Sequence, residues 1–412
     1  TMKFIFIRLL TLLTLSLLIF GIHGCSPVAD DNSNNGNGPG NGGTEPGPFD
    51  AWAGSAACAS CHATKYNTWK SSGHASALKK VENGQKPGEY PETSLPDFPP
   101  GLQNVNNSAG IPSSWADISY VIGGFRWKAQ FTDKNGYLFT GTDTSYHFAS
   151  QGWGAYKAGQ SDMLFDCGKC HAAGWQTVDQ SGSRQDELPG MGGIFFEAGV
   201  SCESCHGAGK NHVDSGGGKG NITVNRDASL CGNCHSRNSD NRISSMDGLV
   251  RDKAQFDELK GVDPDSLASL GKHLAGGIGC NDCHDPHDGT DKSVRFAAAV
   301  DCTDCHQDRI IKPEKWGRTH ADLACTYCHM PAFVKSAVEY SGTGTGYKRG
   351  DMRSHIFKID LQKTDKQQFT NDGNHAYPWL TGKVVCGQCH NGETTFKFVK
   401  PFGPDWTFQV HN

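Results

Sequence analysis

The pattern Cys-x-x-Cys-His occurs eight times in this chain of 412 residues and accounts for 16 of its 17 cysteines. Two cysteines three positions apart, followed directly by a histidine, form the attachment motif of a c-type haem. The thiols bind the vinyl groups on one edge of the porphyrin, and the histidine lies under the iron as its proximal ligand. In chain order, motifs 1 to 8 are Cys58/Cys61/His62, Cys167/Cys170/His171, Cys202/Cys205/His206, Cys231/Cys234/His235, Cys280/Cys283/His284, Cys302/Cys305/His306, Cys325/Cys328/His329 and Cys386/Cys389/His390. We therefore predict eight covalently bound haem c groups.

Other uses of paired cysteines explain the pattern less well. A single Cys-x-x-Cys pair is compatible with a zinc site or a redox dithiol, and an exported chain often forms disulfides. Neither alternative accounts for a histidine after all eight pairs. Neither explains why Cys25 alone lies outside the pattern.

The composition agrees with a core that the polypeptide does not supply alone. Only 36% of residues are hydrophobic, and the 52 glycines are nearly twice the usual share of about 7%. Eight flat apolar macrocycles would provide the missing core. The net charge of −5 and the scattered Lys and Arg residues give no electrostatic footprint for nucleic acid.

The N-terminal residues are typical of an export signal followed by a linker. Lys3 and Arg8 precede the apolar run from Leu9 to Phe20, which predicts a signal peptide over 1–24, with an uncleaved anchor as the weaker alternative. Cys25 follows a glycine as in a bacterial lipobox, so lipidation there competes with ordinary cleavage nearby. The Gly/Asn/Pro-rich segment 25–50 is then a flexible linker that holds the folded part away from a membrane surface.

The function of each haem depends on its sixth ligand, because a second histidine closes the iron and leaves electron transfer alone. Nine histidines remain outside the motifs and the signal peptide. His411 lies one residue from the C-terminus and is the weakest candidate, while Met330 is expected to pack rather than to ligate. The predicted distal ligands match the eight irons in number: His74, His147, His212, His273, His287, His320, His355 and His375.

Chain reach limits two of these assignments and leaves a third open. His287 is three residues from His284, and three residues span at most roughly 11 Å, which is too short to pass around a porphyrin between two ligands of one iron. His287 must therefore serve a neighbouring haem, and the same is expected of His212, six residues after His206. His74 is far enough from motif 1 to serve its own haem or another.

The motifs divide the chain into an N-terminal tetrahaem half (51–245), a connector (246–267) and a C-terminal tetrahaem half (268–412). The first half has four motifs but only three spare histidines, whereas the second has more spares than it needs. At least one haem of the first half should therefore take its distal ligand from the second half or from another subunit.

Secondary structure is predicted to be sparse. Partial alternation over 119–132, the Asp133–Gly136 turn and the segment 137–140 predict a β-hairpin with an Asn-Gly turn. Short helices are expected over 61–69, 252–260 and 316–320. The predicted fold is a multihaem cytochrome, mostly coil with short α-helices and one β-hairpin wrapped around a chain of stacked haems.

Several segments resemble known multihaem cytochromes. They are Cys58 to His62 leading into Trp69–Ala75, Gly199–His212 and Gly279–His287. The first half, with its hairpin and the segment Cys167–Trp175, resembles the tetrahaem outer-surface cytochromes of metal-reducing microbes that polymerise into filaments. The resemblance implies stacked bis-His haems and one distal ligand supplied by the next subunit.

These observations favour an electron carrier that is not an enzyme. It would conduct respiratory electrons at or outside the cell surface, from other cytochromes to an acceptor such as a metal oxide or another cell. Three forms stay open: a homopolymeric filament, a lipid-tethered protein and a monomeric surface or periplasmic shuttle. The alternative function is an octahaem reductase of a small nitrogen or sulfur oxyanion, which usually shows an altered motif or a missing sixth ligand.

Overall fold

The computed structural model describes residues 47–88, 95–96, 102–178, 182–287, 301–309, 323–341 and 348–390. The predicted signal peptide, Cys25, the linker up to residue 46, the predicted helix 316–320, His320 and His411 lie outside these ranges. Among the described residues, no helix is both long enough and apolar enough to cross a membrane.

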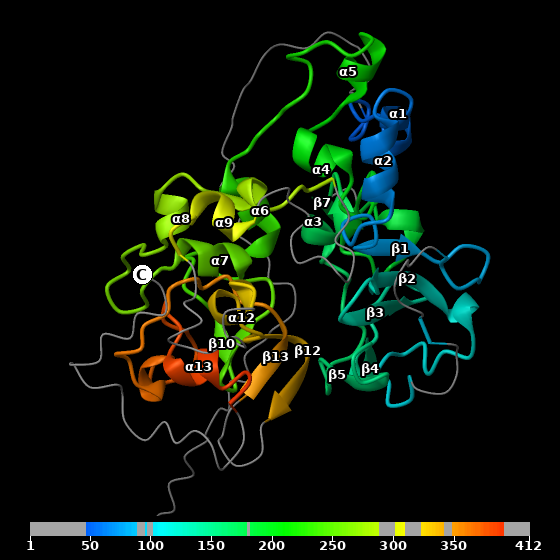
Figure 1. The fold of residues 1–412 in the computed structure, drawn as a ribbon. Helices are drawn as coiled ribbons and strands as arrows, with labels where there is room; N and C mark the ends of the chain where they lie inside the picture. Colours follow the sequence, from blue (N-terminus) through cyan, green and yellow to red (C-terminus); the bar gives the residue numbers. More distant parts are fainter. Residues whose placement is uncertain are drawn as a thin grey trace, which may run out of the picture.

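The first sheet has five antiparallel strands in chain order. They are β1 (Leu78–Lys80), β2 (Ile118–Gly123), β3 (Lys128–Asp133), β4 (Gly141–His147) and β5 (Gly152–Tyr156). Successive side chains of a strand point to opposite faces, so Tyr120 and Ile122 enter one buried cluster while Val121 enters another. Each face of this sheet therefore packs into a buried cluster. The sheet lies on the right of the molecule in Figure 1.

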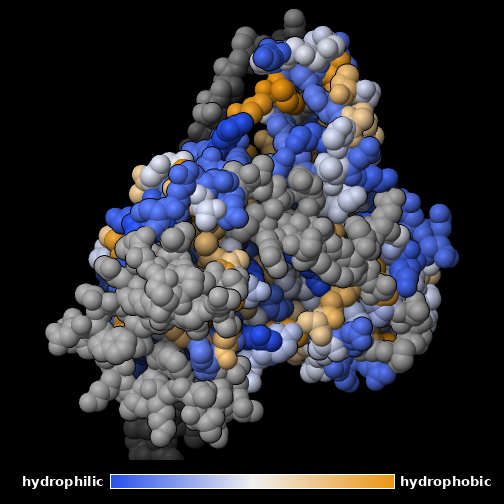
Figure 2. Space-filling view, viewed as in Figure 1, coloured by the Kyte–Doolittle hydropathy of each residue, from blue (hydrophilic) through white to orange (hydrophobic). Residues whose placement is uncertain are grey.

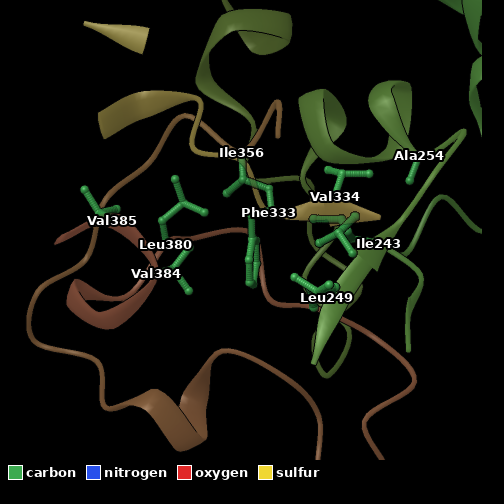
Figure 3. Packing of buried hydrophobic residues seen from close by; sticks show 11 residues of the cluster. Ile243, Leu249, Ala254, Phe333, Val334, Ile356, Leu380, Val384 and Val385 are labelled. Carbon is green, nitrogen blue, oxygen red and sulfur yellow. The ribbon is translucent and has the colours of Figure 1, made fainter. Parts of the chain in front are cut away.

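The second sheet joins the connector to the C-terminal half. Its strands are β10 (Ser245–Met246), β11 (Leu249–Arg251), β12 (Val334–Ser341) and β13 (Lys348–Met352), with β11 parallel to β12. Figure 3 shows the core beside it, where Phe333 and Ile356 lie between the strand residues and the Leu380–Val385 segment. Two small pairs complete the sheets: β6 (Ala172–Ala173) with β9 (Glu197–Ala198), and β7 (Gln176–Thr177) with β8 (Gly193–Ile194).

The prediction of a single β-hairpin was wrong in extent. The Asn-Gly turn is present, since the Asp133 amide donates to the Tyr137 carbonyl at 2.8 Å. However, the segment 119–132 forms two paired strands rather than one, because Gly123 and Gly124 adopt positive φ and turn the chain between β2 and β3. Strands β10 and β11 have only two and three residues, and the partner of β11, β12, is distant in sequence, so they produce no visible alternation. The longer strands β4 and β12 pair with β5 and β13 and were not predicted.

The helices are short and mostly carry the Cys-x-x-Cys-His motifs. They are α1 (Ser55–Ala59), α2 (Ala63–Lys70), α3 (Gly168–His171), α4 (Cys202–His206), α5 (Lys210–Asp214), α6 (Ala228–His235), α7 (Gln255–Lys260), α8 (Lys272–Ala275), α9 (Cys302–Cys305), α12 (Thr326–His329) and α13 (Gly382–Cys386), with 3-10 turns at Trp115–Asp117, Gln185–Glu187, Cys280–Asp282 and Asp365–Gln367. Helix α7 lies within the predicted helix 252–260. Helix α2 begins within the predicted helix 61–69 and ends one residue beyond it. Hydrophilic residues prevail on the described part of the visible face, with only small apolar patches (Figure 2).

Candidate haem sites

Each motif lies on or beside a short helical turn, and the spacing explains why. Helix positions i, i+3 and i+4 share one face, so the two thiols and the histidine project together. Even where the regular helix is interrupted, the turn persists: the histidine amide donates to the carbonyl of the first cysteine at 2.8 Å in motif 1 and 2.9 Å in motif 8.

The motif residues differ in burial and in their place on the helices. Cys167 is buried, with 5% of the residue exposed, but Cys61, Cys305 and Cys389 are exposed. Cys61 follows the end of α1, and Cys389 and the half-buried His390 follow the end of α13, so these three lie beyond the regular helices. The haem-binding roles of Cys61, Cys389 and His390 stay predictions from the motif spacing.

Five motif histidines each face a second imidazole at a nearly constant separation. Two imidazoles on one metal, with bonds of about 2 Å, place their ring centroids roughly 6 Å apart. The observed centroid distances are 6.4 Å for His62–His212, 6.3 Å for His74–His235, 6.0 Å for His206–His287, 6.0 Å for His273–His306 and 6.2 Å for His284–His355. These residues therefore fit an iron between two histidines.

Hydrogen bonds at Nδ1 orient several of these rings. His206 Nδ1 lies 2.7 Å from the Thr223 carbonyl, and His287 Nδ1 lies 2.9 Å from Asp285 Oδ1. In motifs 2 and 7 the same atom lies 2.8 Å from the carbonyls of Ala77 and Phe357, respectively. A bond at Nδ1 sets the tautomer and leaves Nε2 for a metal.

Burial keeps the deepest imidazoles neutral, as metal ligation requires. Burial and the neighbouring His235 lower the pKa of His74 to about 4. Burial and His284 lower the pKa of His355 to about 3. At neutral pH these side chains are therefore uncharged acceptors.

The pairings follow the reach argument and cross the two halves. His287 faces His206 and not His284, and His212 faces His62. His74 faces the motif 4 histidine rather than that of its own motif. The His206–His287 pair brings a histidine of the first half against one of the second half in the same chain, while His171 of the first half faces no described imidazole.

Other predicted ligands are not brought together. Among the described residues, no imidazole faces His171, His147 or His375. His147 lies in β4, where Lys128 and Asp351 influence its charge. His375 has Arg242 and Asp240 as charged neighbours. The distal ligands of motif 7 (His329) and motif 8 (His390) are not among the five pairs, and two predicted candidates, His320 and His411, lie outside the described residues.

Contacts between thiols order the motifs in space. Thiols of different motifs influence each other's pKa, which places motif 1 beside 3, 2 beside 4, 4 beside 5 and 6 beside 7. The pairs are Cys58–Cys202, Cys170–Cys234, Cys231–Cys280 and Cys302–Cys325. Burial is the main cause of the raised pKa values of Cys205, Cys283 and Cys328, and Asp282 is the next cause for Cys283. Thiols of other motifs also contribute, namely Cys231, Cys305 and Cys389, respectively, which places motif 3 beside 4, 5 beside 6 and 7 beside 8. The order is 1-3-4-5-6-7-8, with motif 2 attached to motif 4. In Figure 1 it runs from α1 at the upper right to α13 at the lower left.

A group of charged residues from distant segments lies near motif 2. Burial, followed by the charge of Lys253, lowers the pKa of His171 to about 4, with a smaller contribution from Lys128. Lys128 forms an ion pair with Asp252 at 2.8 Å, and Arg237 binds the same carboxylate at 2.5 Å. Sequence analysis missed this group, because no local spacing connects residues from β3, from the segment after motif 4 and from the end of β11.

A sequence model of the cytochrome c554 and c-prime family matches residues 57–95 and 142–207, which include motifs 1, 2 and 3. The chain is a multihaem c-type cytochrome. The match covers about a quarter of the chain, and the haem number is a prediction from the motifs.

Two comparisons point to one relative of this cytochrome, the dissimilatory sulfite reductase MccA of Wolinella succinogenes. The sequences are 26% identical over 202 residues, which is 41% of this chain and 27% of that protein. The octahaem sulfite reductase structure gives a TM-score of 0.52 at 18% identity, covering 81% of this chain and 64% of that one. The structural likeness concerns the fold, and the sequence match spans only about a quarter of the relative's length.

Two further solved structures are more distant from this cytochrome. The outer cell wall cytochrome OcwA gives a TM-score of 0.42 at 17% identity, covering 82% of this chain and 84% of that one. The undecahaem cytochrome from the S-layer of Carboxydothermus ferrireducens gives 0.45 at 16% identity, covering 86% and 59%.

Proposed function

We propose that this cytochrome carries electrons through eight haems, from a redox partner at one end of the array to an acceptor at the other. The five facing imidazole pairs carry the proposal, because two histidines on one iron leave no position for a substrate. Bound haem supplies the one-electron chemistry, and the polypeptide holds each iron between its ligands and sets its potential by burial and hydrogen bonding.

The proposed setting is the cell surface. The predicted signal peptide and the low-complexity linker support export, and Cys25 is the proposed site of a lipid tether. Other cytochromes are the proposed donors, and a metal oxide or another cell is the proposed acceptor. A filament is not required by this proposal, since His287 of the same chain faces the motif 3 histidine.

A second candidate function, reduction of a small sulfur or nitrogen oxyanion, concerns motif 2 alone. Among the described residues, His171 is the one motif histidine of the N-terminal half that faces no other imidazole. Lys253 and Lys128 contribute positive charge there, which favours an anion. The similarity to a protein named as a sulfite reductase gives this candidate its substrate class.

Electron paramagnetic resonance of the oxidised, haem-loaded protein separates the two functions. Pure electron transfer requires low-spin iron in all eight haems. Oxyanion reduction requires a high-spin ferric signal equal to one haem in eight, altered by added sulfite or nitrite. Consumption of either anion by protein reduced with titanium(III) citrate, which releases no sulfite, then identifies the substrate. More than three high-spin haems would contradict the pairs assigned to motifs 1, 3, 4, 5 and 6, because motifs 2, 7 and 8 are the three without an assigned pair.

A further inference from the structure

Glu203, the second residue of motif 3, binds three backbone amides at once. Its carboxylate is buried, with the residue only 2% exposed. Oε1 accepts from the amides of Ala53 at 2.9 Å and Gly209 at 2.6 Å, and Oε2 accepts from Gly54 at 2.8 Å. Hydrogen bonds to a charged group are stronger than neutral ones.

The three amides belong to the two segments that carry the facing histidines of motif 1. Gly54 directly precedes α1, which contains Cys58 and leads to His62. Gly209 directly precedes α5, which contains His212. One carboxylate inside motif 3 therefore joins the proximal and the distal side of a different haem site.

The segment that leads into α1 and the segment that leads into α5 depend on Glu203 to different degrees. The α1 side has additional support from Glu197, whose Oε2 accepts from the Ser55 amide at 3.1 Å and the Ser55 hydroxyl at 2.9 Å. Helix α5 has five residues and none of them is buried; it projects at the top of the molecule (Figure 1). The Lys210 amide also donates to the Ala51 carbonyl at 3.0 Å, which links the start of α5 to the segment before α1.

We propose that Glu203 is a positioning residue that holds His212 on the iron of motif 1. The proposal rests on the bis-His ligation proposed above for His62 and His212. Because motif 1 is the end of the thiol-contact order, Glu203 then decides whether the terminal haem stays closed and available only for electron transfer. A residue of one attachment motif thus completes the haem site of another.

The test compares Glu203→Ala with His212→Ala in the full, haem-loaded chain. Both variants are expected to retain eight haems by mass and to gain high-spin ferric signal equal to one haem in eight. Added imidazole should return both to the wild-type spectrum, and the double variant should match the single ones. Asp282→Ala is the matched control, since this carboxylate also lies inside a motif but accepts from the Gly279 amide of its own turn at 2.7 Å; it should leave the spin state unchanged.

The outcomes separate this proposal from the ligand assignment. A high-spin signal in His212→Ala without one in Glu203→Ala overturns the role of Glu203 and leaves the ligation intact. No new high-spin signal in His212→Ala overturns the assignment, and the role of Glu203 with it. If Glu203→Ala fails to mature, Gly209→Pro removes one donor while keeping the carboxylate; a high-spin gain supports the proposal, and an unchanged spectrum overturns it.

Discussion

The Asp252 carboxylate binds residues of both sheets, so the effect of its loss on the free energy of unfolding can be estimated from the structure. Its Oδ2 binds Lys128 Nζ at 2.8 Å and the Ser336 hydroxyl at 3.2 Å, while Oδ1 binds Arg237 at 2.5 Å. Lys128 belongs to β3 and also donates to the Ser336 carbonyl of β12 at 3.0 Å. The carboxylate therefore connects the N-terminal sheet with the sheet of the C-terminal half.

Asp252→Asn is expected to destabilise the folded protein by about 3 kcal/mol at neutral pH. Breaking one partner of a buried ion pair costs about 3–5 kcal/mol. The lower end applies because the Lys128 side chain is 32% exposed and is partly screened by water, and because asparagine retains one oxygen acceptor. The side chain of Asp252 itself is only 17% exposed.

The pH dependence gives a second check on the same substitution. Burial alone raises the pKa of Asp252, but Lys128 and Arg237 outweigh it and hold the pKa below its usual range. An aspartate with a lowered folded-state pKa stabilises the protein above its unfolded-state pKa, about 3.9, and the stabilisation is lost as the pH falls below that value. The difference between wild type and variant should therefore be full at pH 7 and shrink below about pH 4.

Denaturant unfolding followed by far-ultraviolet circular dichroism measures both quantities on the haem-loaded protein. Asp214→Asn is the matched control, because the Lys210–Asp214 pair at 2.8 Å is exposed on both sides and should contribute less than about 0.5 kcal/mol. If Asp252→Asn shifted the midpoint no more than this control, the cluster would not join the sheets. An equal difference at pH 7 and pH 3 would show that charge is not the cause.

Three further substitutions test the sites. His287→Ala should convert one haem in eight to high spin by removing the ligand opposite His206, and an unchanged resonance spectrum would refute the link between the halves. His375→Ala should leave the spin state unchanged, although its position in the sequence makes it a candidate ligand. Gly168→Ala should lower haem loading or stability, because a Cβ there would lie 1.8 Å from Trp175 and overpacking costs roughly 1–3 kcal/mol; full loading with an unshifted melting curve would contradict this packing.

The attachment turns were predictable because their geometry is local. The Cys-x-x-Cys-His spacing sets one face of one helical turn, and chain reach excluded His287 from its own motif without any structure. The pairing of distal and motif histidines was harder to predict from the sequence, because His74 and His235 are distant in sequence and meet only in the folded chain. Counting histidines can predict how many ligands exist, but it cannot predict which ring meets which.

The sheets and the Asp252 cluster were not visible in the sequence for a related reason. Strand β10 has two residues and β11 has three, which is too short for an alternating pattern to be recognised. Strand β11 pairs with β12, more than eighty positions away. The positioning role proposed for Glu203 likewise depends on amides about 150 positions away in sequence.

The order of motifs bears on how the two proposed functions relate. Motifs 1 and 8 are the ends of the main path. An electron conduit needs only these two ends, one for a donor and one for an acceptor. Motif 2 lies beside motif 4, where Cys170 is close to Cys234. Its haem is therefore a side branch that does not lengthen the path from motif 1 to motif 8. A branch contributes to electron flow only if its haem exchanges electrons with something that binds there, and the lysines near His171 favour an anion. Transport along the main path and reduction at the branch are therefore compatible. Lys253→Met should weaken only the reduction at motif 2. Sulfite or nitrite should oxidise the reduced variant more slowly, while electron exchange between external partners stays unchanged. Equal loss of both would place Lys253 on the main path instead.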